Sequence, residues 1–150
     1  MISRQQFFML MTIGFVLSVC VTNVMGENLE QYNEGKDGTV YYYYKNSVKR
    51  KSGIVNVWTE ARFNGKNKEW GKMVDECKKS SKLDSINDCN KLFSRKDLIE
   101  INCKDDKCGL IKHVLYDGNL TILYSSSPLL EWDYIIPDSN TDELKNKVCQ

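Results

Sequence analysis

Residues 39–63 read TVYYYYKNSVKRKSGIVNVWTEARF, with two runs of β-branched and aromatic residues on either side of a short polar stretch. In the second run, 54–63, every other residue forms an apolar row: Val55, Val57, Thr59, Ala61 and Phe63. Such alternation is typical of a strand that buries one face. A stretch as short as 46–53 joins two strands as antiparallel neighbours. This chain therefore needs an antiparallel sheet with at least one covered face.

Three further β-forming segments follow, at 96–103, 108–117 and 120–126. The Asp-Gly pair at 117–118 predicts a tight turn between the last two of them. Residues 27–38 are polar and contain two glycines, so we expect them to lead into the fold without regular structure.

Two segments predict helices. Trp70, Met73 and Cys77 recur at helical spacing and predict a helix near 68–80, followed by an irregular return to residue 95. Residues 139–149 predict a closing helix with Ser139 or Thr141 as its cap. The order of elements predicts an α+β domain: a single antiparallel β-sheet of about five to six strands, with a helical insert and a C-terminal helix packed on it.

The first 26 residues have the pattern of a secretory signal peptide, with one Arg, an apolar run over 7–21 and small residues after it. We expect cleavage before Glu27, which leaves residues 27–150 as one domain. A retained anchor is the alternative, but a 15-residue apolar run is shorter than the ~20 residues that a spanning helix needs. A second alternative is a bacterial lipoprotein acylated at Cys20, in the segment LSVC. We expect an exported protein of the periplasm, cell surface or medium, or of the outer membrane if Cys20 carries a lipid.

The expected mature domain is balanced in charge. Without Arg4 it carries 20 Lys and Arg against 20 Asp and Glu. Nucleic-acid-binding domains normally carry a basic excess. The composition therefore argues against nucleic acid as a partner.

Five cysteines follow the signal, and an exported chain of this kind favours disulfides. We expect Cys103 to pair with Cys149, tying a central strand to the last helix, and Cys77 to pair with Cys89 within the insert. Cys108 is then left over. A zinc site or a redox pair is the alternative, but CKDDKC separates its cysteines by four residues, where common zinc and thioredoxin motifs have two. We expect no metal and no cofactor.

No catalytic constellation is visible. His113 is the only histidine, and no motif marks a nucleophile beside it. The weak binding candidates are the basic residues Lys49, Arg50 and Lys51 of the expected hairpin turn, and Trp58 on the strand after it. Basic residues attract acidic proteins or glycans, and tryptophan and tyrosine are favoured at interfaces. The alternatives to a binding role are that the three basic residues form an ordinary solvated turn and that Trp58 only packs against its neighbours.

Three blocks of the sequence together resemble the bacterial surface-adhesin protein E family: VYYYYKNSVKRKSGIVNVWTEARF, LIEINCKDDKCGLIKHVLYDGNL and EWDYIIPDSNTDELKNKVC. The resemblance implies an antiparallel sheet flanked by helices, a disulfide between Cys103 and Cys149, and export. It also implies adhesion to host matrix or other extracellular proteins or glycans. The adhesive segment of the family lies in the variable region that corresponds to 64–95, so no binding residue can be carried over.

The leading hypothesis is an exported, non-enzymatic binding module resembling a surface adhesin. The alternative is a small disulfide-stapled structural or accessory protein of the periplasm or cell envelope. A third reading is an enzyme or redox protein that uses Cys108 or His113. A free Cys108 thiol and an open sheet edge each offer a route to a homodimer.

Overall fold

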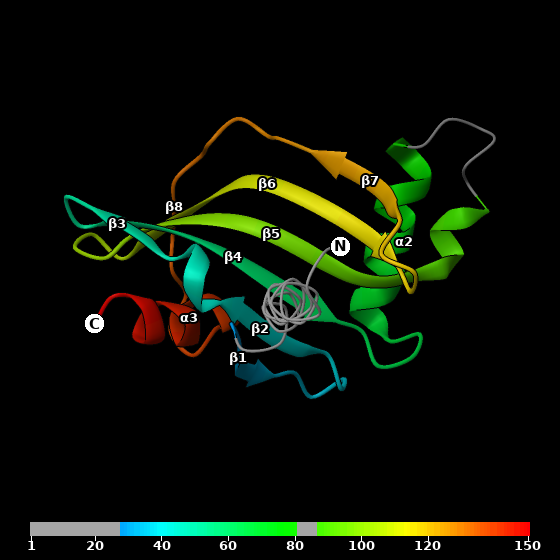
Figure 1. The fold of residues 1–150 in the computed structure, drawn as a ribbon, viewed down its shortest axis with the longest axis horizontal. Helices are drawn as coiled ribbons and strands as arrows, with labels where there is room; N and C mark the ends of the chain where they lie inside the picture. The colour runs from blue at the N-terminus through cyan, green and yellow to red at the C-terminus, as the bar shows by residue number, and fades with distance from the viewer. Residues whose placement is uncertain (1–27, 81–86) are drawn as a thin grey trace, which may run out of the picture.

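The computed structural model describes residues 28–80 and 87–150, which form one eight-stranded antiparallel sheet with two α-helices (Figure 1). The expected signal peptide, 1–26, and Cys20 lie outside the described residues. The main path of the sheet runs β1-β2-β4-β5-β6-β7, with β3 beside β4 and β8 beside β6. The strands are β1 (Leu29–Glu34), β2 (Val40–Tyr44), β3 (Lys49–Lys51), β4 (Ile54–Arg62), β5 (Leu92–Asn102), β6 (Lys107–Asp117), β7 (Ile122–Ser126) and β8 (Asp133–Tyr134). The helices are α2 (Lys68–Ser80) and α3 (Asn140–Val148), with 3-10 turns η1 (Lys45–Ser47) and η3 (Asp88–Lys91).

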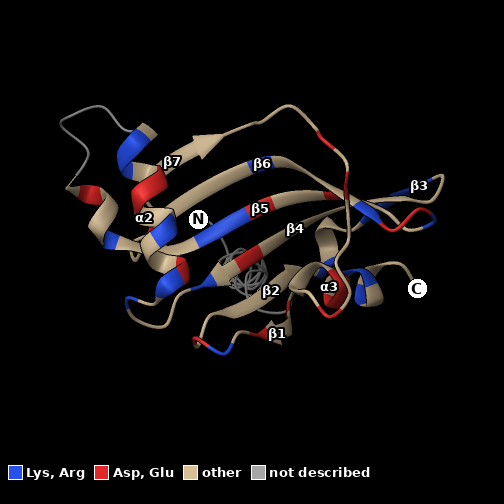
Figure 2. Ribbon diagram, turned by 180° about the vertical axis from the view of Figure 1, so that it is seen from behind, with Lys and Arg blue, Asp and Glu red and all other residues tan. Residues whose placement is uncertain are grey.

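The predicted α+β class with an antiparallel sheet and a C-terminal helix is confirmed. The apolar row of β4 is buried as expected, and Val57 is fully enclosed. We call the side of the sheet that carries this row the helix side, because α2 and α3 lie on it (Figure 2). The opposite side, which carries Tyr44, Trp58 and Lys96, is the open side, because neither α2 nor α3 packs on it (Figure 1).

Helix α2 begins and ends at the predicted residues. Asn67 Oδ1 accepts the backbone N–H of Trp70 at 2.8 Å and so satisfies a free donor of the first turn. Val74 and Cys77 face the sheet and share a core cluster with Phe63 and Leu115. A disulfide joins Cys77 to Cys89, just before β5.

Helix α3 covers the other end of the helix side. Ser139 is its N-cap, and its hydroxyl accepts the Asp142 backbone N–H at 3.2 Å. The fully buried Leu144 and Val148 pack with a core cluster of Tyr43, Val55, Val57, Ile101 and Ile135. A disulfide joins Cys149, directly after this helix, to Cys103 at the end of β5.

Four local expectations were wrong. Residues 27–38 are not an irregular leader, because β1 pairs there with β2 from Leu29 to Glu34. Strand β5 starts at Leu92, earlier than expected, and β8 adds two residues to the sheet in a segment for which no strand was expected. The stretch 46–53 is only partly a turn: the reversal is confined to Ser52 and Gly53, both at positive φ, and β3 precedes them. Two consecutive positive φ values suit a tight antiparallel turn.

None of the helices in 28–80 and 87–150 has the length and apolar character needed to cross a bilayer.

Candidate functional site

The open side carries a shallow hollow of about 310 Å³, lined by Tyr44, Ser47, Trp58, Lys96 and Tyr116. These residues come from β2, η1, β4, β5 and β6, so five elements meet around it. The Lys96 ammonium lies 5.2 Å from the centre of the Tyr44 ring and 5.1 Å from that of Tyr116. Such distances allow cation–π attraction. The hollow is therefore walled by aromatic rings around one positive charge.

A buried carboxylate fixes the base of this arrangement. Glu60 is 3% exposed and accepts a hydrogen bond from the Tyr44 hydroxyl, while Arg62 Nε lies 2.7 Å from its other oxygen. Lys96 Nζ is 3.8 Å from Glu60, so two cations share one carboxylate. Burial raises the pKa of Tyr44, and the hydrogen bond to Glu60 raises it further. Tyr44 is therefore a neutral, oriented wall of the hollow at physiological pH.

The indole N–H of Trp58 and the hydroxyl of Tyr116 are free to meet a ligand. Within the part of the chain that the structure describes, neither group has a hydrogen-bond partner. The hydroxyl of Ser47 is already engaged, because it donates to the Tyr44 carbonyl and accepts the Trp58 backbone N–H. The hollow thus presents two side-chain donors and an ammonium.

The basic residues expected to act together in the hairpin turn are divided between the two sides of the sheet. Lys49 and Lys51 lie opposite Asn56 and Ile54, which places them on the open side with Trp58. Arg50 faces the helix side, where its Nε donates to the Val148 carbonyl at 3.1 Å at the end of α3. A cation there interacts favourably with the helix dipole. All three residues are exposed, but Arg50 has a structural contact at the end of α3.

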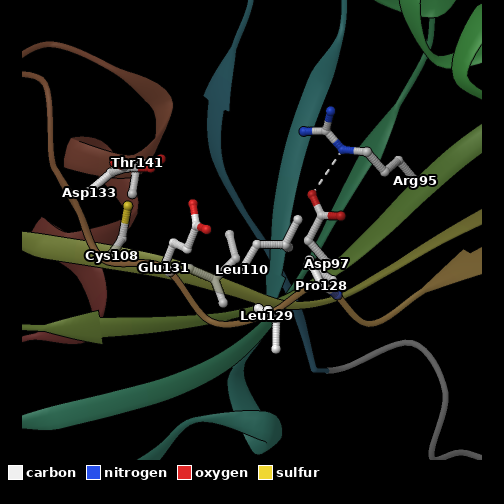
Figure 3. Close-up of a pocket in the computed structure, with 11 residues that line it drawn as sticks. Arg95, Asp97, Cys108, Leu110, Pro128, Leu129, Glu131, Asp133 and Thr141 are labelled. Carbon is white, nitrogen blue, oxygen red and sulfur yellow. Dashed lines mark ion pairs between the residues drawn. The ribbon is translucent and has the colours of Figure 1, made fainter.

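The helix side has a larger cleft of about 410 Å³, to which α3 contributes Thr141 (Figure 3). Arg95 and Asp97 of β5 line it, and residues 128–133, before and at β8, supply another wall. Arg95 Nε lies 2.9 Å from Asp97, and its Nη1 lies 2.9 Å from Glu69 of α2. Burial disfavours the charge of Arg95, but the carboxylates of Asp97 and Glu69 outweigh it and raise the pKa of the guanidinium. This network attaches α2 to the sheet.

His113 belongs to the same network. It lies on β6 opposite Asp97 and is 5% exposed, with its Nδ1 2.7 Å from Asp97 Oδ1. Its Nε2 is buried and has no hydrogen-bond partner among the described residues, with Glu76 Oε1 3.9 Å away. No Ser, Thr or Cys side chain in 28–80 or 87–150 hydrogen-bonds to this ring. The geometry is that of a histidine held by a carboxylate without a paired nucleophile.

Cys108 is the free cysteine among the described residues and lines the helix-side cleft, with Asp133 and Thr141 nearby (Figure 3). Burial raises the pKa of its thiol, and the negative charge of Asp133 raises it further. A raised pKa keeps the thiol protonated at neutral pH, which makes it a poor nucleophile. In the described part of the chain, no three His, Cys, Asp or Glu side chains gather as a metal would require.

These features define an α+β domain with a helix-covered sheet side and an aromatic, cationic open side. The sequence of residues 29–150 matches the family model for surface-adhesin protein E, and the chain belongs to that family. It is a surface-adhesin-like protein.

Solved structures of protein E from Haemophilus influenzae share this fold. One is 12% identical, with a TM-score of 0.53, and the match covers 85% of this chain and 87% of that chain. A second crystal form is 9% identical, with a TM-score of 0.51 and coverage of 87% and 94%. Protein E from a non-typeable strain is 12% identical, with a TM-score of 0.50 and coverage of 87% and 81%. At this identity the likeness concerns the fold alone. No curated protein matches the sequence.

Ser47, Lys96 and Tyr116 of the open-side hollow were not anticipated from the sequence. Lys96 lies in β5 and Tyr116 in β6, and the pairing of β4 with β5 and of β5 with β6 brings them to the same side as Trp58. Nothing in the sequence marks Lys96 or Tyr116 as a binding residue, because charged and aromatic residues are common in strands. Trp58 was anticipated, and it lines the hollow.

Proposed function

We propose that residues 27–150 form an exported, non-enzymatic binding module that acts at the bacterial cell surface. Its ligand is a protein or glycan of the matrix or of the cell envelope. The observation that carries this proposal is membership of the surface-adhesin protein E family over residues 29–150. The open side of the sheet supports it, because aromatic and basic side chains suited to binding remain accessible there.

The helix-side cleft does not favour catalysis as the main role. Arg95 and Asp97, which line it, are paired with each other, and Arg95 also pairs with Glu69. His113, outside the lining, is held by the Asp97 carboxylate. Cys108 carries a protonated thiol at neutral pH, as its environment requires. Replacing Cys108 and His113 together with Ala should leave ligand binding unchanged if this reading is right.

The proposal is tested with the processed protein, purified from its host with its disulfides intact. Immobilised matrix proteins, a glycan array and envelope fractions are the ligands, and binding to at least one of them is the expected result. Protease added to intact cells should cleave the protein. Protection from protease, together with no binding in any of the three assays, would overturn the adhesive role and favour an accessory protein held inside the envelope.

We also propose that the signal peptide ends before Glu27. The supporting observation is the short apolar run after a single Arg in the first 26 residues. Intact-mass measurement of the host protein checks this directly. A chain that starts at Cys20 and carries acyl mass would instead establish a lipid-anchored protein of the outer membrane.

A further inference from the structure

We propose that the open side of the sheet binds a linear acidic polysaccharide, with one uronic acid residue seated in the hollow between Trp58, Lys96 and Tyr116. This inference rests on the proposed binding function and names the site and the chemical class of its ligand.

The hollow has the chemistry that a carboxylated sugar requires. The aromatic rings of Tyr44, Trp58 and Tyr116 offer apolar surface to the C–H face of a pyranose. The Lys96 ammonium lies between two of these rings and can form a charge-assisted hydrogen bond with a carboxylate. The volume of the hollow, about 310 Å³, is at the lower end of the ~300–1,000 Å³ range of small-molecule sites. This size suits one sugar ring.

Two unpaired hydrogen-bond donors at the rim of the hollow also suit a sugar ligand. The Trp58 indole N–H and the Tyr116 hydroxyl have no hydrogen-bond partners among the residues described. Sugar hydroxyls and ring oxygens accept such hydrogen bonds. The Glu60 carboxylate does not repel the ligand strongly, because it already interacts with Arg62, Lys96 and the Tyr44 hydroxyl.

Charge around the hollow favours a polymer with repeated negative charges over a single small anion. By strand register, the open side carries these basic residues: Lys49, Lys51, Arg62, Lys96, Lys107 and Lys112. Its strand carboxylates are Glu34, Glu60 and Glu100, so cations outnumber them two to one. Within the described ranges, no Asp or Glu lies in ion-pair distance of Lys49, Lys51 or Lys112. Because the whole domain is formally neutral without its signal, this surplus is local to one side.

Lys49 and Lys51 extend the site beyond the hollow. They stand on β3, beside the part of β4 that leads to Trp58, and both are exposed. A polysaccharide chain that leaves the hollow in this direction passes two further ammonium groups. Repeated carboxylates would then gain affinity by multivalent contact.

The test measures binding of hyaluronan oligosaccharides, which alternate a uronic acid with a neutral sugar and carry no sulfate. Calorimetry with the processed wild-type protein should show binding that weakens as salt rises. Lys96→Met keeps an apolar stem over the rings but removes the charge, and Trp58→Ala removes one wall. Each should weaken binding by about 10-fold, equivalent to about 1.4 kcal/mol. Lys66→Met is the matched control, because Lys66 also lies over an aromatic ring, that of Trp70, away from the hollow. It should leave affinity unchanged.

Two further measurements keep the result interpretable. In an NMR spectrum of ¹⁵N-labelled protein, the signal of the Trp58 indole N–H should shift when hyaluronan oligosaccharides are added. If Trp58→Ala does not fold, Trp58→Phe replaces it in the binding assay. A neutral chitin oligosaccharide and a polyglutamate peptide should both bind more weakly. Equal affinity of Lys96→Met and wild type, or polyglutamate that binds as tightly as hyaluronan, would overturn the inference. If matrix proteins bind while hyaluronan does not, this inference fails and the proposed adhesive function stands.

Discussion

The disulfide between Cys103 and Cys149 should stabilise the domain more than the one between Cys77 and Cys89. The first closes a loop over a sequence separation of 46 residues, and the second over 12. A cross-link removes conformations from the unfolded chain, and the resulting loss of entropy grows with the logarithm of the number of residues in the closed loop. With that relation, the longer bridge contributes about 4.0 kcal/mol at 25 °C and the shorter about 2.8 kcal/mol.

The assay must separate the cross-link from packing, because Cys77 and Cys89 are also buried core residues. Two variants, Cys77→Ala/Cys89→Ala and Cys103→Ala/Cys149→Ala, each retain one bridge, and both carry Cys108→Ser to prevent disulfide exchange. Urea unfolding of each variant is measured oxidised and then reduced. The difference within one variant reports the bridge alone, since the side chains stay the same.

Reduction should lower the free energy of unfolding by about 4 kcal/mol in the variant that keeps the longer bridge. In the variant that keeps the shorter bridge, the loss should be about 3 kcal/mol. Equal losses, or a larger loss from the shorter bridge, would refute the reasoning from loop length. Such a result would mean that each bridge acts through local order in the native state, for example by holding α3 against the sheet.

Three other predictions concern the caps, the buried ion pairs and pH. Replacing Ser139 with Ala removes the N-cap of α3 and should lower the free energy of unfolding by about 1 kcal/mol in urea. Asp97→Asn leaves the buried guanidinium of Arg95 with Glu69 as its remaining ion-pair partner. It should lower the free energy of unfolding by about 3 kcal/mol. A decrease below about 1 kcal/mol would show that Asp97 is dispensable. Raising the pH through the ordinary tyrosine pKa of 10.0 should destabilise the domain, because burial raises the pKa of Tyr44 in the folded state and the unfolded chain ionises first. Tyr44→Phe should make stability less dependent on pH in that range, measured by thermal unfolding.

Elements with a strong local period could be predicted from the sequence. Strand β4 alternates over its whole length, and α2 has apolar residues at helical spacing, so both were located closely. Strand β1 was missed because its sequence, LEQYNE, has little β-forming character. It forms because β2 offers an open edge and because Tyr32 packs against Tyr41 and Tyr43.

The candidate site was harder to predict, because it depends on the register between distant strands. Trp58 lies opposite Leu98, which places Lys96 one pair further along the same side of β5. An irregularity in register between Leu98 and Ile99 then decides which β6 residues share that side. A one-residue change in register moves every side chain to the other face. The sequence therefore indicated Trp58 as a candidate but neither Tyr116 nor the lysine at the centre of the site.

The two sides of the sheet face different constraints, and this bears on how far a ligand can be inferred within the family. On the helix side, Val57, Ile101 and Leu144 are fully buried, so a change in volume there costs stability. On the open side, a residue such as Lys96 must suit a β-strand, but neither α2 nor α3 packs on that side. Because neighbouring residues of a strand point to opposite sides, the open side can change its chemistry while the core keeps its shape. At 9–12% identity, the protein E structures therefore share the framework of this domain without defining its ligand, and binding specificity must be read from the open-side residues of this chain.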